Sequence, residues 1–318
     1  MRIRRLYLVL LFVLVAAVFV VLPGKSVYAL GQGSCAVVIN SNASGGLAVR
    51  TVPSTSSSTL IYRMPDGTKV RITGSSITFG GYTWWPHRGS NGISGWSAGA
   101  YLQETSNCTG VSAYTAANQL SQQVKLRNGQ WVAASNVSGS EPVIYLDSIF
   151  GKPGQFPLSA PITSRSGMRT SALYAAVINQ FAVGDSPQNR YLQNGYTYCN
   201  TFAGDVMRAM GVPLPIKSAS DPATIGAAAL YNWLVAGNGW TRIYPNLYAS
   251  DLTRLKNHVN AGYPAVASTS GHIAVIRPGQ TTTNWRSLVM AQAGAQNKNS
   301  ILLSAVWPST TPAFFIRN

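Results

Sequence analysis

Acidic residues are scarce in this chain of 318 residues, which contains 8 Asp and Glu against 24 Lys and Arg. Only 10% of its residues are charged, whereas soluble domains average about 25%. So few carboxylates argue against an acidic metal site, and three His with three Cys are too few for an array of zinc modules. The 46% of hydrophobic residues exclude wholesale disorder. Low charge with abundant Ser, Thr, Asn and Gly is typical of a protein that works outside the cell.

Long apolar runs are also scarce, and the single one covers residues 6–22, directly after three arginines. Small residues follow and end at Ala29. This order predicts a signal peptide over residues 1–29 that is cleaved after Ala29. The alternative is an uncleaved anchor, because a run of this length is at the lower limit for crossing a bilayer. Both interpretations place the rest of the chain outside the cytoplasm, secreted or associated with the cell wall, and limit membrane contact to this segment.

The net charge stays strongly positive after that cleavage, falling from +16 to +12 as three arginines and Lys25 are removed. A positive exported protein is attracted to anionic polymers and surfaces, which outside a bacterium are the teichoic acids of the cell wall, anionic glycans or phospholipid surfaces. The alternative is that the charge only keeps the protein soluble. No nucleic-acid-binding motif is present, so we expect no nucleic acid partner, and we expect a monomer.

The three cysteines divide into a pair and an odd one. Cys35 and Cys108 bracket one segment, and disulfides persist in exported proteins, so we predict that these two are bonded. Closing that loop would contribute about 4 kcal/mol in the loop-entropy model. Cys199 is left over, which leaves three possibilities: an intermolecular link, a reactive thiol, or an inert buried thiol.

Residues 35–108 carry short apolar and aromatic runs separated by Gly and Pro. This pattern predicts a small β-barrel or sandwich. We expect its strands at residues 47–50, 60–62, 69–72, 82–86, 95–96 and 101–102.

The motifs LAVRTVPSTSSS, MPDGTKVRITG, YTWWPHR and GISGWSAGAYL in this segment resemble bacterial SH3 (SH3b) domains over residues 46–102. The resemblance implies a small all-β SH3-like barrel that binds wall peptide or glycan and targets an attached hydrolase. Aromatic faces suit such ligands, although each ring has the barrel core as its alternative place. The candidate wall-binding residues are Tyr82, Trp84, Trp85 and Trp96. We interpret His87 as a solvated loop residue.

Residues 109–165, rich in Ser, Gly, Gln and Asn, are predicted to form a connector that is either a linker or packed on the next domain. Within it we expect a short helix at 114–126 and strands at 131–132 and 142–146.

Residues 166–318 contain the candidate chemistry, beginning with a predicted helix at 170–181. A second helix is predicted from Cys199, because its apolar residues share one side and Gly211 follows as a stop signal. Cys199 therefore opens a helix, where backbone N–H groups and the helix dipole stabilise a thiolate. That is the setting a nucleophilic cysteine needs.

A base and its orienting group are found further along the chain. His272 begins a predicted strand, and Gln292 ends the next one. If the two strands are adjacent and antiparallel, Gln292 lies close enough to orient the imidazole by a hydrogen bond. A helix-borne Cys, a sheet-borne His and a polar orienter fit nucleophilic cleavage of an amide.

The motifs YTYCNTFAGDVMRAMGVPLP, GHIAVIRP and AQAGAQN resemble CHAP and NlpC-type papain-like cell-wall hydrolases over residues 172–307. The resemblance implies an α+β fold with a helix-borne Cys packed on an antiparallel sheet. It makes Cys199 the nucleophile, His272 the general base and acid, and Gln292 the orienter. Several relatives bind calcium near the nucleophile, but only Asp185 and Asp205 lie close in this sequence. We therefore expect no metal and no cofactor.

The oxyanion donors are expected to include the backbone N–H of Cys199. The side chains of Gln193, Tyr198 or Asn200 are candidates for a second donor or a substrate contact. The expected function is an exported peptidoglycan hydrolase, a cysteine amidase or peptidase. The alternatives are a non-catalytic wall-binding protein and an acyltransferase of the same superfamily.

Overall fold

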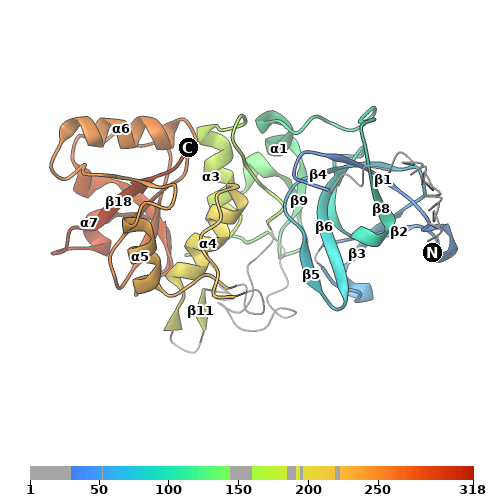
Figure 1. Ribbon diagram of the computed structural model, residues 1–318, viewed down its shortest axis with the longest axis horizontal. Helices are drawn as coiled ribbons and strands as arrows, with labels where there is room; N and C mark the ends of the chain where they lie inside the picture. The colour runs from blue at the N-terminus through green and yellow to red at the C-terminus, as the bar shows by residue number, and fades with distance from the viewer. Residues whose placement is uncertain (1–29, 52, 144–159, 185–190, 194–195, 219–222) are drawn as a thin grey trace, which may run out of the picture.

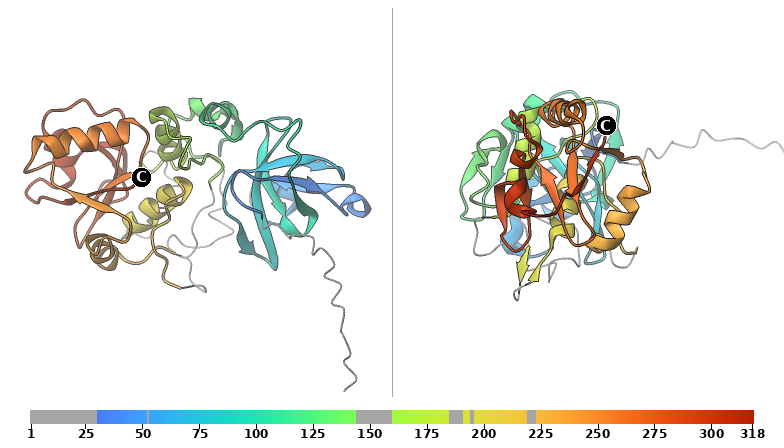
Figure 2. Two further views of the ribbon diagram at one scale, coloured as in Figure 1. Left: turned by 45° about the horizontal axis from the view of Figure 1, so that its top comes forward. Right: turned by 90° about the vertical axis from the view of Figure 1, so that its left-hand side faces the viewer.

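The computed structural model describes residues 30–51, 53–143, 160–184, 191–193, 196–218 and 223–318. It is a mixed α+β structure with two large antiparallel sheets, one of eight strands and one of six. Figures 1 and 2 show these sheets at opposite ends of the long axis, with α1, α3 and α4 between them. The predicted signal peptide lies outside the described residues. Within those residues, no helix has both the length and the apolarity to span a membrane.

The eight-stranded sheet contains every strand predicted for the N-terminal segment. Its order is β3-β2-β7-β6-β4-β1-β8, with β5 paired to β6. Buried and more exposed residues alternate along β2 and β4, because each strand turns one face to the core. The strands are β1 (Cys35–Val38), β2 (Leu47–Arg50), β3 (Leu60–Met64), β4 (Lys69–Ile72), β5 (Ile77–Phe79), β6 (Tyr82–Gly89), β7 (Ser94–Ala98) and β8 (Leu102–Thr105).

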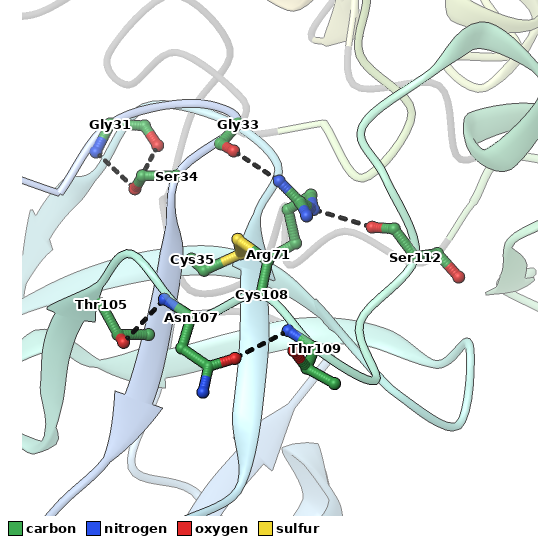
Figure 3. The surroundings of a disulfide bond; sticks show 10 residues. All are labelled: Gly31, Gly33, Ser34, Cys35, Arg71, Thr105, Asn107, Cys108, Thr109 and Ser112. Carbon is green, nitrogen blue, oxygen red and sulfur yellow. Dashed lines mark hydrogen bonds between the residues drawn. A yellow bond between two sulfur atoms is a disulfide. The ribbon is translucent and has the colours of Figure 1, made fainter.

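The predicted disulfide between Cys35 and Cys108 is confirmed, with the two Cα atoms 5.7 Å apart (Figure 3). It joins β1 to the segment that follows β8. Beside it, the Arg71 guanidinium donates hydrogen bonds to the carbonyl oxygens of Gly33 and Ser112, at 2.8 and 2.7 Å. Covalent and polar links together fasten both ends of the module to its sheet.

Two of the aromatic residues suggested for wall binding are core residues. Trp84 and Trp96 are each 3% exposed and pack together with Ala98. Tyr82, by contrast, is 43% exposed, and Trp85 is half-buried. The alternative that rings of this module fill its interior therefore holds for Trp84 and Trp96.

His87 is buried, so its interpretation as a solvated loop residue is wrong. Strand β6 runs three residues beyond the predicted end at residue 86 and carries His87 into the sheet. Its Nε2 lies 2.8 Å from the Ser97 hydroxyl. Burial lowers the pKa of His87 to about 3, so this ring is neutral at neutral pH.

The described residues of the predicted connector belong to the C-terminal core. They form α1 (Ala116–Ser121), β9 (Gln123–Lys125) and β10 (Trp131–Ala133). The helix is shorter than predicted, because β9 begins two residues after its end. Buried apolar residues of this segment join one hydrophobic cluster with the C-terminal helices and sheet: Val124, Leu126, Val137, Val143 and Ile162. Residues 144–146 of the predicted strand lie outside the described part of the chain.

The C-terminal sheet has the order β13-β18-β14-β15-β16-β17. Every residue of β14, β15 and β18 is buried, so these strands form the centre of the core. The strands are β13 (Thr241–Ile243), β14 (Ala265–Ser268), β15 (Ile273–Ile276), β16 (Val289–Gln292), β17 (Lys298–Leu302) and β18 (Ala313–Ile316). A short hairpin of β11 (Leu192–Gln193) and β12 (Tyr196–Thr197) precedes the candidate nucleophile.

Helices border this sheet and include the helix predicted from Cys199. They are α3 (Ser171–Asn179), α4 (Cys199–Ala209), α5 (Ala227–Val235), α6 (Ala249–Asn260) and α7 (Leu303–Val306). Helix α4 ends as predicted, because Gly211 adopts a left-handed φ of 69° just beyond it. Phe202, Val206 and Met207 of α4 are fully buried. This packing holds the first residue of α4 against the beginning of β15.

Candidate active site

Cys199 is the first residue of α4, and its side chain is 9% exposed. The backbone N–H groups of Ile273, Asn200 and Cys199 itself face the thiol and lower its pKa. Ile273 begins β15 and directly follows His272. The start of α4 therefore packs against the start of β15, at the residue after the candidate base.

Burial has the largest effect on the thiol. The three N–H groups lower the pKa of Cys199, but desolvation outweighs them and raises it above the ordinary value. The N–H groups at the helix start favour the thiolate as expected, but the effect of burial is larger. Cys199 rests as a neutral thiol and needs a base to become a nucleophile.

The predicted pairing of the next two strands is confirmed. Antiparallel β15 and β16 pair Val275 with Ala291, which puts the beginning of one strand beside the end of the other. The Nε2 atom of His272 lies 2.5 Å from Oε1 of Gln292. Gln292 is buried, so this hydrogen bond is shielded from water.

A second hydrogen bond fixes the orientation of the Gln292 amide. Its Nε2 donates to the carbonyl oxygen of Gln296 at 2.8 Å, which turns Oε1 toward His272. An amide oxygen only accepts, so Nε2 of His272 must carry the hydrogen. The neutral ring then has an unprotonated Nδ1, which is the atom that can accept a proton from the thiol.

The pair is enclosed by a tight loop and an aromatic ring. A methyl group placed on Gly294 would lie 2.8 Å from Oε1 of Gln292 and 2.9 Å from Cε1 of His272. On another side, the Trp307 ring lies 5.4 Å from the imidazole, centroid to centroid. Burial lowers the pKa of His272, and the bond to Gln292 opposes this effect. The imidazole is therefore neutral near pH 7, as a general base requires.

Gln292 lies at an irregularity in the sheet. The register between β16 and β17 shifts between Met290, which pairs with Ile301, and Gln292, which pairs with Lys298. Such a bulge changes the direction of a side chain at the end of a strand. The shift and the following Gly294 together position the amide against His272.

The three side chains predicted as candidate oxyanion donors have different surroundings in the structure. The side-chain amide of Asn200 donates both hydrogens within the fold, to the carbonyl oxygens of Thr224 and Ile225 at 3.1 and 3.0 Å. This argues against a role for that side chain in the oxyanion hole. Tyr198 is half-buried directly before α4, and the Gln193 side chain lies outside what the structure describes. Backbone N–H groups at the start of α4 are the donors that remain.

The structural role of one buried acidic residue, Asp205, was not predicted from the sequence. Asp205 of α4 is buried and accepts a hydrogen bond from the Tyr191 hydroxyl at 2.8 Å. The Tyr191 ring in turn packs edge-on against Phe202. Asp205 thus supports the helix that presents Cys199. Asp185 lies outside the described residues, among which no group of three or more His, Cys, Asp and Glu is placed to hold a metal ion.

A cavity of about 400 Å³ borders the turn between β14 and β15. Residues 268–270, which precede His272, form one wall, and the Ser268 hydroxyl donates to the His272 carbonyl oxygen at 3.2 Å. Further lining residues of the cavity are Thr311–Ala313, Arg242–Tyr244 and Tyr231. These segments belong to the β14, β18 and β13 side of the sheet, whereas Gln292 lies on the other side of β15. The lining reaches the turn that precedes His272, but it does not include Cys199, His272 or Gln292.

Two tryptophans and a histidine of this unit have structural roles. Trp240 is buried in the main core, and Trp233 packs against that core. His258 is half-buried, with its Nε2 3.2 Å from the Pro264 carbonyl oxygen and 3.1 Å from that of Arg317. It joins α6 to the end of the chain, away from the Cys199 site.

No protein-family model matches this chain, and a search of curated proteins finds no significant match. The chemistry of the site is therefore inferred from its residues and geometry.

Proposed function

We propose that this protein is an exported cysteine amidase or peptidase that cleaves amide bonds in the peptides of peptidoglycan. The observation that carries the proposal is the connected arrangement of Cys199, His272 and Gln292. The Ile273 N–H, one residue after His272, faces the Cys199 thiol, and Nε2 of His272 lies 2.5 Å from Oε1 of Gln292. A buried thiol with a neutral, oriented imidazole is the starting state for nucleophilic acyl transfer.

The reaction begins when Nδ1 of His272 takes the proton of the Cys199 thiol as sulfur attacks the amide carbonyl carbon. The new C–S bond gives a tetrahedral intermediate, whose oxyanion accepts hydrogen bonds from backbone N–H groups at the start of α4. The C–N bond then breaks, and the imidazolium gives its proton to the leaving amine. His272 next takes a proton from water, which attacks the thioester and releases the carboxylic acid and the free thiol.

Gln292 has a defined part in this cycle. Its oxygen accepts the Nε2 hydrogen of His272 and keeps the ring in the tautomer whose Nδ1 is basic. The amide is neutral, so it opposes the burial effect on the pKa of His272 only in part. The imidazole thus stays neutral before attack and can carry a proton during it.

The cell wall as substrate is supported by features outside the triad. The predicted signal peptide would export the chain, and the positive charge of the exported chain favours binding to anionic polymers. The motifs of the two segments resemble an SH3-like wall-binding domain and a papain-like hydrolase, and we propose those folds for the eight-stranded and six-stranded units. Arg242 lines the cavity next to residues 268–270 and would suit the carboxylates of wall peptides.

Digestion of purified peptidoglycan tests the reaction class. The full chain is incubated with washed wall material, and new amino groups and new reducing sugars are measured in parallel. We expect amino groups to accumulate without reducing sugars. Reducing sugars without amines would indicate a glycosidase, and wall binding with neither product would favour the non-catalytic alternative.

A further inference from the structure

A second cavity, of about 140 Å³, lies on the eight-stranded unit, and nothing in the catalytic site accounts for it. It is lined by two arginines, Arg50 and Arg63, and by the aromatic residues Tyr82, Trp84 and Tyr101. Because a water molecule occupies about 30 Å³ in the liquid, this volume suits a small anionic group with a few attached carbon atoms.

The two arginines lie on one face of the β2–β3 hairpin. Arg63 pairs with Ala48, and Arg50 follows Ala48 by two residues on the same strand. Residues two apart on a strand share a face, so the two side chains are diagonal neighbours across the pair. The positive charge of Arg63 lowers the pKa of Arg50, in addition to a larger lowering by burial.

Within the described part of the chain, both guanidinium groups contact only neutral oxygen atoms. Arg50 donates to the Ser56 carbonyl oxygen at 2.6 Å and to the Thr59 hydroxyl at 3.1 Å. Arg63 donates to the Gly46 carbonyl oxygen at 2.9 Å. Neither has a carboxylate partner there, so the repulsion between them is not balanced by an acid.

One acidic residue, Asp66, contacts the lining of this cavity, and its carboxylate already accepts hydrogen bonds within the fold. Asp66 accepts hydrogen bonds through Oδ1 from the backbone N–H and the hydroxyl of Ser41, at 2.8 and 2.6 Å. Ser41 lines the cavity, but these bonds hold the carboxylate to the loop that follows β1. The two arginines thus keep donor capacity for a ligand, since each guanidinium has five N–H donors.

We propose that the Arg50–Arg63 cavity binds an oxyanion, a carboxylate or a phosphate, carried by the polymer of the cell wall. Guanidinium groups bind both anions through paired hydrogen bonds. The exposed Tyr82 and the half-buried Tyr101 contact the sugar or carbon skeleton next to the anion. The proposal rests on the proposed function only for the identity of the polymer, because binding does not need the catalytic residues.

A sedimentation assay with an uncleaved wall tests this site. The full chain carrying Cys199→Ala is mixed with purified walls of two kinds, one intact and one freed of phosphodiester polymers by acid. Arg63→Gln is the main variant, since among the described residues the Arg63 guanidinium donates only to the Gly46 carbonyl oxygen. We expect it to raise the Kd for the wall about tenfold, as loss of one charge-assisted contact does. Thermal unfolding checks that the variant is folded.

Lys69→Gln provides the matched control, because it removes one positive charge from β4 of the same unit outside the cavity lining. Its Kd should change much less than that of Arg63→Gln. If Arg63→Gln raises the Kd for both kinds of wall, the anion is a peptide carboxylate. If it raises the Kd for intact walls alone, the anion is a phosphate. Equal binding by the parent chain and Arg63→Gln, equal losses in both variants, or no wall binding by the parent chain would overturn the proposal. Failure of peptidoglycan cleavage would leave it standing.

Discussion

The amide of Gln292 determines which nitrogen of His272 can act as a base. Its oxygen meets Nε2, because its own nitrogen is held by the Gln296 carbonyl oxygen. The hydrogen on the imidazole is thereby placed on the side away from the reaction, and Nδ1 is left basic. The hydrogen bond from Gln292 to the Gln296 carbonyl oxygen therefore decides which nitrogen of His272 carries the hydrogen.

Changing Gln292 to Glu is expected to shift the pH dependence of the reaction. A carboxylate stabilises the imidazolium, so the pKa of His272 rises from its lowered value in the parent protein. The neutral imidazole is the active form, and the acid limb of kcat/KM therefore moves to higher pH, by about one unit. Gln292→Ala removes the bond that raises the pKa, so its acid limb moves to lower pH. Profiles measured on released amines check both signs, and unchanged acid limbs in both variants would refute the role given to Gln292.

At the scale of the elements, the site is built where the start of α4, the start of β15 and the end of β16 meet. The Ile273 N–H joins the first two through the Cys199 thiol. The register shift at Gln292 and the closeness of Gly294 to His272 position the third element, the end of β16. The loop after β16 thus acts as a positioning element, because its backbone occupies the space next to the imidazole.

Gly294→Ala is expected to lower kcat about tenfold to a hundredfold, because small displacements of catalytic groups have effects of this size. The added methyl group would lie within 3 Å of both Gln292 and His272 and must push the pair apart. Gly271→Ala is the matched control, since a methyl group there meets no other atom within 4 Å. Steady-state kinetics and thermal unfolding are measured for both. A parent-like kcat in folded Gly294→Ala would contradict the assigned packing.

At the scale of the whole molecule, local patterns predict much of what is seen. Alternation predicts β2 and β4 to the residue, and the apolar stripe with Gly211 predicts the bounds of α4 closely. The order of the strands that carry His272 and Gln292 is likewise readable, because a short connection favours antiparallel neighbours. The disulfide follows from the compartment and from the positions of two cysteines.

What the sequence could not predict depends on contacts between distant residues. The extra length of β6 buries His87, and its burial depends on packing between strands. The neutral state of the Cys199 thiol depends on desolvation by the surrounding core, whereas its position on α4 alone suggests a thiolate. The closeness of Gly294 to the imidazole was not predicted, because it depends on the register shift of β16.

Comparison of the parent chain with Cys199→Ala on purified peptidoglycan tests the central claim most directly. Rates of amine release are measured for both proteins at equal concentration, with thermal unfolding as a check of the fold. We predict that the substitution lowers the rate at least about a thousandfold, to the background without protein, since loss of a nucleophile removes most of the catalysis. Equal release by the two proteins would show that Cys199 is not the nucleophile and would contradict this account.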